Sequence, residues 1–350
     1  MTNATIPTTN VRSTQPITED LAPPTIPSAH AAPVQHTRRY SAIRRLVGRN
    51  AGLTLLYVLS LNLLPLLLLM PTVIAAAESG TLQTTVNDAN LIGIAQAIGM
   101  LLGLGILLII RRGQIVSRDF WVGAIDRRRM TPTRFLALTA LLIMVGAMSD
   151  AITTGLTSLL RLLGISLTSN TLAMINQTMS NSVIMVVSVT VFAPIIEEIL
   201  FRGMMMGSLR QRGKLFAIIT TAVLFGAMHG DLIQGISAMF GGLLLGYIAM
   251  EYSLIWAIVF HFINNAILAT GLTKLLALLP DAAKQPSYIA FLAVGSVIGL
   301  IILWSRRIEI RDYIATNRSP RGSYVGWTSL RFLLMVLFLI MATASSFSLM

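Results

Sequence analysis

Long apolar runs recur along most of this 350-residue chain, separated by short segments rich in arginine. Hydrophobic residues make up 55% of the sequence and charged residues only 11%. About 20 apolar residues in a helix cross the ~30 Å hydrocarbon core of a bilayer. Within lipid, each such segment must satisfy its own backbone hydrogen bonds, which a helix does. The sequence therefore predicts an all-α, polytopic membrane protein.

We expect about nine transmembrane helices (eight to nine), preceded by a disordered tail. The tail, residues 1–37, is rich in Pro and Thr and has no apolar periodicity. A basic juxtamembrane collar follows at 38–50, and the transmembrane domain occupies 51–350. The predicted spans are 51–77, 90–110, 134–160, 182–210, 214–230, 232–251, 254–279, 287–305 and 329–349.

Lysine and arginine fall mainly on alternate connections between these runs. With the amino terminus inside, only Arg161, Lys274 and Lys284 lie outside. This asymmetry is typical of the positive-inside rule. It predicts a multi-pass protein of the cell membrane with a cytoplasmic amino terminus and an external carboxyl terminus. The net charge of +12 is then explained by topology, so the expected partner is the lipid bilayer and not a nucleic acid.

Two adjacent carboxylates and an arginine interrupt the fourth apolar run, at Glu197, Glu198 and Arg202. A charged side chain in hydrocarbon costs roughly 3 kcal/mol on insertion scales, so such residues suggest function. Glu198 precedes Arg202 by four residues, the order that favours an ion pair within one helix. Glu197 points about 100° away from Glu198. We therefore predict a fixed Glu198–Arg202 pair and a Glu197 side chain that faces a cavity.

The predicted membrane part contains only two histidines, His229 and His261. His261 and Asn265 are four residues apart, so they share one helix face. His229 follows Phe225 by the same spacing. His229 falls near the outer end of its run, whereas His261 lies about two turns from the inner side of its own. The two can meet only if the fifth helix starts deep or is tilted.

Taken singly, each of these residues has a structural explanation, but together they favour hydrolysis. Glu197 would be the general base for a water that His229 holds, and His261 and Asn265 would donate to an oxyanion. A zinc ion held by Glu197, His229 and His261 is an alternative, although no HExxH motif is present. Two further hypotheses are a carrier that uses the Glu/His set as a proton relay and a non-catalytic immunity or scaffold protein. The chain has no cysteine, which excludes a catalytic thiol.

Three motifs resemble those of the CPBP family of intramembrane proteases, which includes the CAAX prenyl endopeptidases of the Rce1 type and the bacterial Abi proteins. The family pattern is EExxxR, then FxxxH, then HxxxN or HxxxD. It stands in this sequence as Glu197-Glu198-Ile-Leu-Phe-Arg202, Phe225-Gly-Ala-Met-His229 and His261-Phe-Ile-Asn-Asn265. The resemblance covers about residues 182–270.

The resemblance implies an Rce1-like helical core at about 134–305, with the motifs at 193–265 and a membrane-embedded cavity reached from the cytoplasmic side. It implies hydrolysis of a peptide bond in a membrane-associated protein or peptide. By motif position, Glu197 and His229 would activate the water, while His261 and Asn265 would stabilise the oxyanion. Members of the family are usually labelled metalloproteases, and the resemblance leaves open a glutamate-dependent or a metal-dependent mechanism.

Overall fold

The computed structural model describes residues 31–123 and 127–349, which are almost entirely helical. The chain divides into two units, residues 1–38 and 39–350; helix α1 begins within the first, and every other element lies in the second. Within the described residues, seven helices are long and apolar enough to cross a membrane. Two shorter apolar helices, Lys214–Met228 and Leu330–Ala344, coincide with the two remaining predicted runs. The predicted all-α polytopic fold is confirmed.

Before the motif region, the helices are α1 (Ala31–Glu78), α2 (Leu82–Val86), α3 (Ala89–Ile115), α4 (Arg118–Val122), α5 (Pro132–Leu162) and α6 (Asn170–Asn181). The fourth predicted run consists of α7 (Val183–Val187), η1 (Ser188–Phe192), α8 (Ala193–Glu198), η2 (Ile199–Met205), α9 (Met206–Leu209) and η3 (Arg210–Arg212). It is followed by α10 (Lys214–Met228), α11 (Leu232–Glu251), α12 (Leu254–Phe262), η4 (Ile263–Gly271), α13 (Leu272–Ala277), α14 (Asp281–Ser305), α15 (Arg307–Thr316), η5 (Ser323–Thr328) and α16 (Leu330–Ala344). Segments η1, η2 and η4 are π-helical.

The amino-terminal tail differs in part from its prediction. Residues 1–30 lie outside the described residues, but residues 31–37, predicted to be disordered, belong to α1. Pro33 falls in the first turn of this helix. Proline is tolerated in the first turn because the amide hydrogens there have no partner within the helix.

The last predicted span, 329–349, is also corrected. Its helix, α16, ends at Ala344, and the chain then forms the short strand β2 (Phe347–Leu349). Strand β2 pairs antiparallel with β1 (Ile165–Leu167), with Ile165 opposite Leu349. Each strand has an apolar–Ser–apolar sequence, and this alternation with a period of two is typical of β structure.

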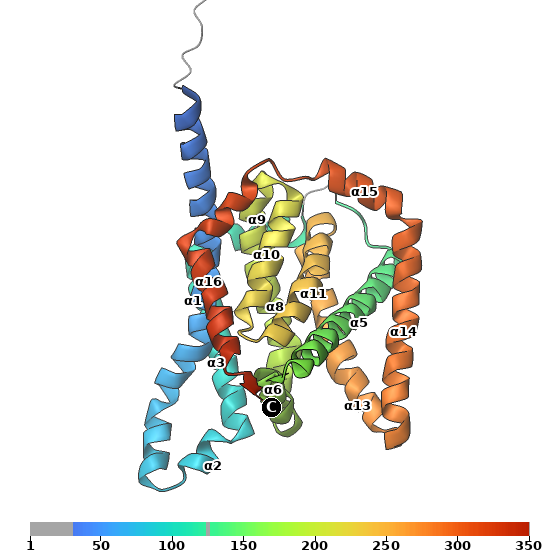
Figure 1. Ribbon diagram of the computed structural model, residues 1–350. Coiled ribbons are helices and arrows are strands. Elements are labelled where there is room, and N and C mark those ends of the chain that lie inside the picture. Colours follow the sequence, from blue (N-terminus) through green and yellow to red (C-terminus); the bar gives the residue numbers. More distant parts are fainter. Residues whose placement is uncertain (1–30, 124–126, 350) are drawn as a thin grey trace, which may run out of the picture. The chain divides into compact units, whose positions relative to one another are not determined.

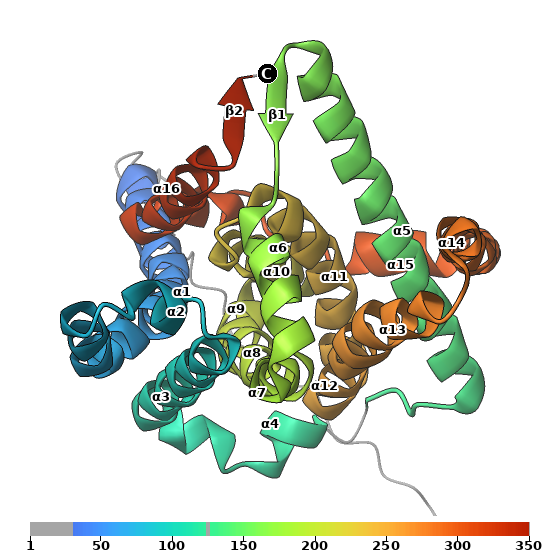
Figure 2. The same ribbon diagram turned by 90° about the horizontal axis from the view of Figure 1, so that it is seen from below.

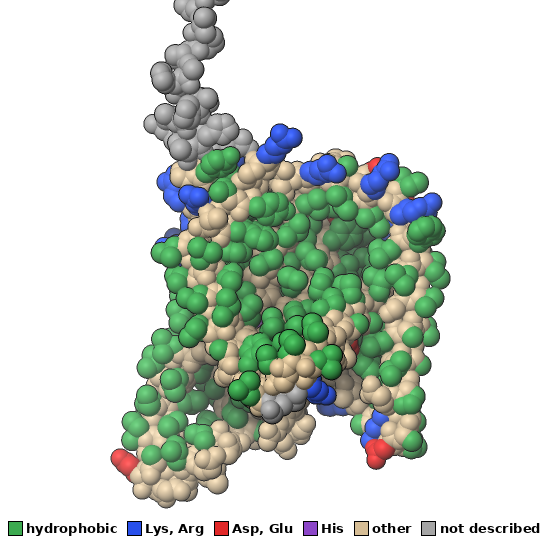
Figure 3. Space-filling view, in the orientation of Figure 1, with side chains coloured by type: hydrophobic (Ala, Val, Ile, Leu, Met, Phe, Trp, Pro, Cys, Tyr) green, Lys and Arg blue, Asp and Glu red, His purple; other side chains and the backbone are tan. Residues whose placement is uncertain are grey.

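The motif-bearing helices lie in the middle of the second unit (Figures 1 and 2). Helices α8, α10, α11 and α12 are flanked by α1, α3 and α16 on one side and by α5, α13 and α14 on the other. The face seen in Figure 3 is covered with hydrophobic side chains, and most of its lysine and arginine side chains lie along the upper edge. The arrangement buries the motifs inside a surface suited to lipid.

Helices α10 and α11 approach each other closely at two glycines. A Cβ at Gly226 would lie 2.6 Å from the carbonyl oxygen of Gly235, and a Cβ at Gly235 would lie 2.9 Å from that of Gly226. Small residues allow such backbone contact between membrane helices. The close approach brings α11 against the segment of α10 that carries Phe225 and His229.

Glu251 joins α10, α11 and α15 at the arginine-rich end, the edge along which most lysine and arginine side chains lie in Figure 3. Its Oε1 accepts hydrogen bonds from Lys214 Nζ at 2.7 Å and from Tyr313 Oη at 2.8 Å. These contacts link the end of α11 to the start of α10 and to α15. Partial burial and the bond to Glu251 raise the pKa of Tyr313, which keeps its hydroxyl a donor.

We expect Glu251→Ala to lower the free energy of unfolding by about 1–3 kcal/mol, because both donors lose their acceptor. Glu309→Ala is the control, since its pair with Arg306 is exposed on both sides, and exposed pairs contribute about 0–1 kcal/mol. Denaturant unfolding of both variants in detergent micelles measures the difference. Equal effects of the two substitutions would contradict a stabilising role for the Glu251 contacts.

Candidate active site

The backbone around the two glutamates departs from α-helical geometry. Two π-helical segments, η1 and η2, flank the six residues of α8. The amide of Ala193 donates to the carbonyl of Ser188, five residues earlier, and Pro194 directly after it has no amide hydrogen to donate. Such widened turns occur often at functional sites. The helix is therefore perturbed one turn before Glu197 and Glu198.

Glu198 and Arg202 form a fully buried ion pair. The distance from Arg202 Nη1 to Glu198 Oε1 is 2.6 Å, and both side chains are 0% exposed. Arg202 Nη2 donates to the carbonyl of Gly242 on α11 at 3.1 Å, and the guanidinium carbon lies 4.5 Å from the centre of the Phe225 ring. The ion pair predicted from the spacing is confirmed. Breaking a buried pair of this kind by removing one partner costs about 3–5 kcal/mol.

His261 lies between the two glutamates. Its Nδ1 is 2.9 Å from Glu198 Oε1, and its Nε2 is 3.8 Å from Glu197 Oε2. Because an ionised carboxylate only accepts hydrogen bonds, Nδ1 carries a proton and donates it to Glu198. The nitrogen Nε2 is thereby directed at Glu197. The pair with Arg202 fixes Glu198, and Glu198 in turn orients the imidazole.

Phe225 lies against both histidines. Its ring centre is 5.2 Å from that of His229 and 5.8 Å from that of His261, each with an interplanar angle of 89°. His229 Nδ1 is 2.8 Å from the carbonyl oxygen of Phe225, so Nδ1 is the donor and Nε2 is left with a lone pair in the neutral ring. Both histidines thus contact the same aromatic ring.

Asn265 lies one helical turn after His261 and makes its own hydrogen bonds. Its Nδ2 donates to the carbonyl of Val189 on η1 at 3.0 Å, and its Oδ1 accepts from Asn264 Nδ2 at 3.0 Å. One hydrogen of the Asn265 amide has no hydrogen-bond partner among the described residues. His261 and Asn265 thus both contact the fourth span, as their spacing predicts, but through different residues of it.

Two atoms of the ion pair keep unused hydrogen-bonding capacity. Glu198 Oε2 and Arg202 Nε are buried without a partner among the described residues. Buried polar groups are usually hydrogen-bonded, and one that is not costs stability.

The contacts of Gly242, Val189 and Asn264 were not predicted from the sequence. Gly242 belongs to a GxxxG pair with Gly246, but that pattern alone indicates only close helix packing.

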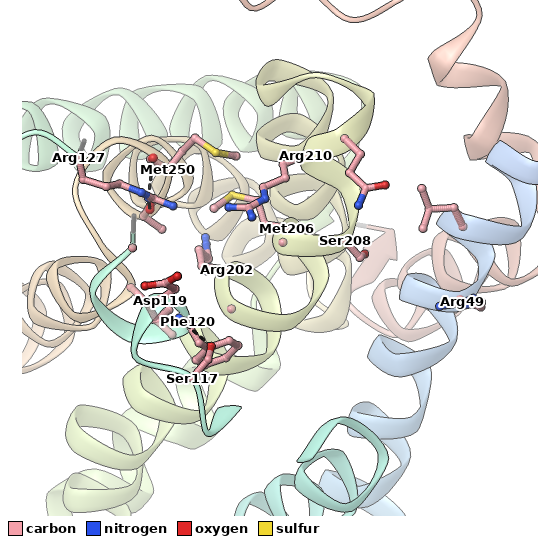
Figure 4. Close-up of a pocket in the computed structure, with 17 residues that line it drawn as sticks. Arg49, Ser117, Asp119, Phe120, Arg127, Arg202, Met206, Ser208, Arg210 and Met250 are labelled. Carbon is pink, nitrogen blue, oxygen red and sulfur yellow. Dashed lines mark hydrogen bonds between the residues drawn. The ribbon is translucent and has the colours of Figure 1, made fainter. Parts of the chain in front are cut away.

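A cavity of about 480 Å³ lies beside Arg202 (Figure 4). Its lining includes Arg202, Met206 and Arg210 from the fourth span, Phe120 from α4 and Met250 from α11. A Cβ on Gly203 would overlap the Phe120 ring, so this glycine lets α4 dock against the span.

Glu197 is not among the residues that line this cavity. The side chain of Glu197 is only 9% exposed and faces His261. Glu197 therefore does not open onto this cavity, and that its side chain faces a cavity stays a prediction.

The comparison with protein families identifies the region that holds these residues. Residues 179–267 match the family model described as Type II CAAX prenyl endopeptidase Rce1-like. The chain carries an Rce1-like domain. All six predicted site residues lie within the matched range, and the match confirms the resemblance of the three motifs. No curated protein and no solved structure matches the chain. With seven long apolar helices among its described residues, the chain is a multi-pass membrane protein.

The predicted zinc site requires donor atoms of Glu197, His229 and His261 to converge on one point. His229 and His261 each have Nδ1 bound to a fixed oxygen, an arrangement that orients metal-ligating histidines. However, no three His, Asp or Glu side chains within the described ranges are grouped closely enough to hold a metal ion. Glu197, His229 and His261 therefore do not form a three-ligand site in this conformation, and we derive no step through a metal.

Gly242 gives a prediction about the ion pair. A Cβ at this position would lie 3.1 Å from Arg202 Nη2, 3.2 Å from the Phe225 ring and 3.3 Å from the Ala222 backbone. We expect Gly242→Ala to destabilise the protein by about 1–3 kcal/mol through overpacking. The neighbouring Gly241 has open space around its Cβ position, so Gly241→Ala should leave stability within about 0.5 kcal/mol of wild type. Thermal unfolding in detergent compares the two, and an equal effect would contradict the packing account.

Proposed function

We propose that the Rce1-like domain is an intramembrane endopeptidase in which Glu197 is the general base for a water. The observation that carries this proposal is the contact chain from Arg202 through Glu198 and His261 to Glu197. It places an oriented imidazole nitrogen beside a buried carboxylate. The family match supports peptide-bond hydrolysis as the reaction.

Charge balance supports a protonated His261. Two carboxylates and one guanidinium would leave a net negative charge inside the protein, where an uncompensated charge is costly. An imidazolium at His261 makes the group neutral, with Glu197 and Glu198 balancing Arg202 and His261. In this state Nε2 carries a proton that can be donated, and Glu197 is ionised and able to accept one.

In the reaction, Glu197 takes a proton from water while the water oxygen bonds to the carbonyl carbon of the substrate. The carbonyl electron pair moves to oxygen and forms the oxyanion. When the oxyanion collapses, the carbon–nitrogen bond breaks and the proton on Glu197 passes to the leaving nitrogen. The products are a carboxylic acid, which then ionises to a carboxylate by losing its proton to water, and an amine. His229 holds the attacking water by accepting a hydrogen bond at Nε2.

The oxyanion needs donors that are already in position. The protonated Nε2 of His261 is one, because Glu198 fixes its ring. The second is the remaining hydrogen of the Asn265 amide, whose orientation is set by Val189 and Asn264. Each donor is held by a neighbour that takes no part in the chemistry.

The substrate would be a membrane-associated protein or peptide. The matched family is described as a type II CAAX prenyl endopeptidase, which supports cleavage of an internal peptide bond in such a substrate. The arginine distribution favours a cytoplasmic amino terminus and an external carboxyl terminus. Substrate entry requires local movement of the helices around Glu197, since its side chain is 9% exposed.

Glu197 and Glu198 should respond differently to substitution. We expect Glu197→Gln to reduce cleavage of a membrane-tethered peptide by at least about 10³-fold, while the unfolding free energy stays near that of wild type. Glu198→Gln should reduce both, because it leaves Arg202 buried without its partner. Cleavage by purified protein in liposomes and unfolding in detergent measure the two effects.

The matched control for this pair is Glu309→Gln, which changes an exposed carboxylate and should leave both measurements unchanged. Persistence of cleavage in Glu197→Gln would show that this carboxylate is not the base. A variant that loses cleavage only because it unfolds would be recognised by its unfolding curve.

Asn265 should affect the rate without changing substrate binding. Removal of one oxyanion donor typically lowers kcat by about 10²–10³-fold, so we expect that loss for Asn265→Ala with KM nearly unchanged. Asn264→Ala, which removes only the orienting contact, should cause a smaller loss. Steady-state kinetics with the tethered peptide tests this, and a rise in KM at constant kcat would assign Asn265 to substrate binding instead.

A further inference from the structure

An apolar groove with two arginines contains none of the six predicted site residues, although its Arg49 also lines the cavity beside Arg202. It is lined by Arg49, Gly52, Leu53, Leu55, Leu56 and Leu59 of α1, Ile110 of α3, and Arg331 and Leu334 of α16. The volume of the groove is about 700 Å³. Apart from the two arginines and Gly52, every lining residue is leucine or isoleucine.

The two arginines are both near the start of the groove and lack counter-ions. Arg331 crosses α1 at Gly52, where a Cβ would lie 3.1 Å from its Cδ and 3.4 Å from its Nη1. Arg49 is three residues before Gly52, so it lies on the same face of α1. Among the described residues, neither guanidinium has an ion pair or hydrogen bond. The start of the groove therefore carries two uncompensated positive charges.

The apolar part of the groove continues along α1 from these charges. Positions 49, 52, 53, 56 and 59 follow helical spacing and form one stripe. From Arg49 to Leu59 the helix rises about 15 Å at 1.5 Å per residue. That length is about half of the ~30 Å hydrocarbon core, which is the depth of one leaflet. A ligand that matches the groove has an anionic head and an apolar chain about one leaflet long.

We propose that this groove binds one anionic phospholipid from the leaflet at the arginine-rich end. The lipid phosphate lies between Arg49 and Arg331, and one acyl chain follows the leucine stripe of α1. Because the groove includes both α1 and α16, the bound lipid joins the first and last apolar helices of the chain. Lipid binding in this groove does not rest on the proposed peptidase activity.

The experiment is native mass spectrometry of the full-length chain in detergent, after addition of phosphatidylglycerol, phosphatidylcholine or inorganic phosphate. Wild type should retain one phosphatidylglycerol, and Arg49→Gln/Arg331→Gln should retain it about tenfold less, since basic residues near the membrane surface attract anionic lipid. The matched control is Arg311→Gln/Arg318→Gln, which removes two exposed charges outside the groove and should bind as wild type does.

Three results would overturn the proposal. Equal retention of phosphatidylglycerol by wild type and Arg49→Gln/Arg331→Gln would mean that the arginines do not hold it. If wild type retained phosphatidylcholine as well as phosphatidylglycerol, the net charge of the head group would not be recognised. Displacement of the lipid by millimolar inorganic phosphate would show that the acyl chain adds nothing. Unfolding curves of each variant confirm that lipid loss is measured on folded protein.

Discussion

The buried Glu198–Arg202 ion pair determines where the other polar groups of the domain lie. Arg202 takes a second acceptor from α11, the Gly242 carbonyl, while Glu198 accepts from His261 on α12. Three spans are thus joined through two side chains. Removing either partner leaves a buried charge without compensation. That costs far more stability than replacing both partners with apolar side chains.

Aromatic and small residues make that arrangement possible. Phe225 contacts the guanidinium of Arg202 and both histidine rings, so one ring separates the ion pair from His229. Gly242 leaves the space that Arg202 and Phe225 occupy. The site is therefore held by packing as well as by charge. Charges are screened weakly in this buried interior, which strengthens the interaction of Glu197 with His261.

Local geometry explains which features could be predicted from the sequence. The Glu198–Arg202 pair follows from a spacing of four residues within one helix, and the apolar runs follow from composition. The bond from Asn265 to Val189 could not be predicted, because it depends on two π-helical segments meeting across helices. Nor could the burial of Glu197, since helical spacing gives the direction of a side chain but not what covers it. The predicted last span was too long because hydropathy does not distinguish the end of α16 from strand β2.

The charge state of His261 is the most direct test of whether the group of Glu197, Glu198, Arg202 and His261 is neutral. The chain has four histidines, so ¹⁵N NMR of histidine-labelled protein, with His261→Gln for assignment, can observe both nitrogens of this ring. If the group of Glu197, Glu198, Arg202 and His261 is neutral, both nitrogens carry a proton in wild type near neutral pH. In Glu197→Gln, where one carboxylate has been removed, only Nδ1 should keep its proton. A neutral His261 in wild type, or the same charge state in both proteins, would contradict the charge-balanced site.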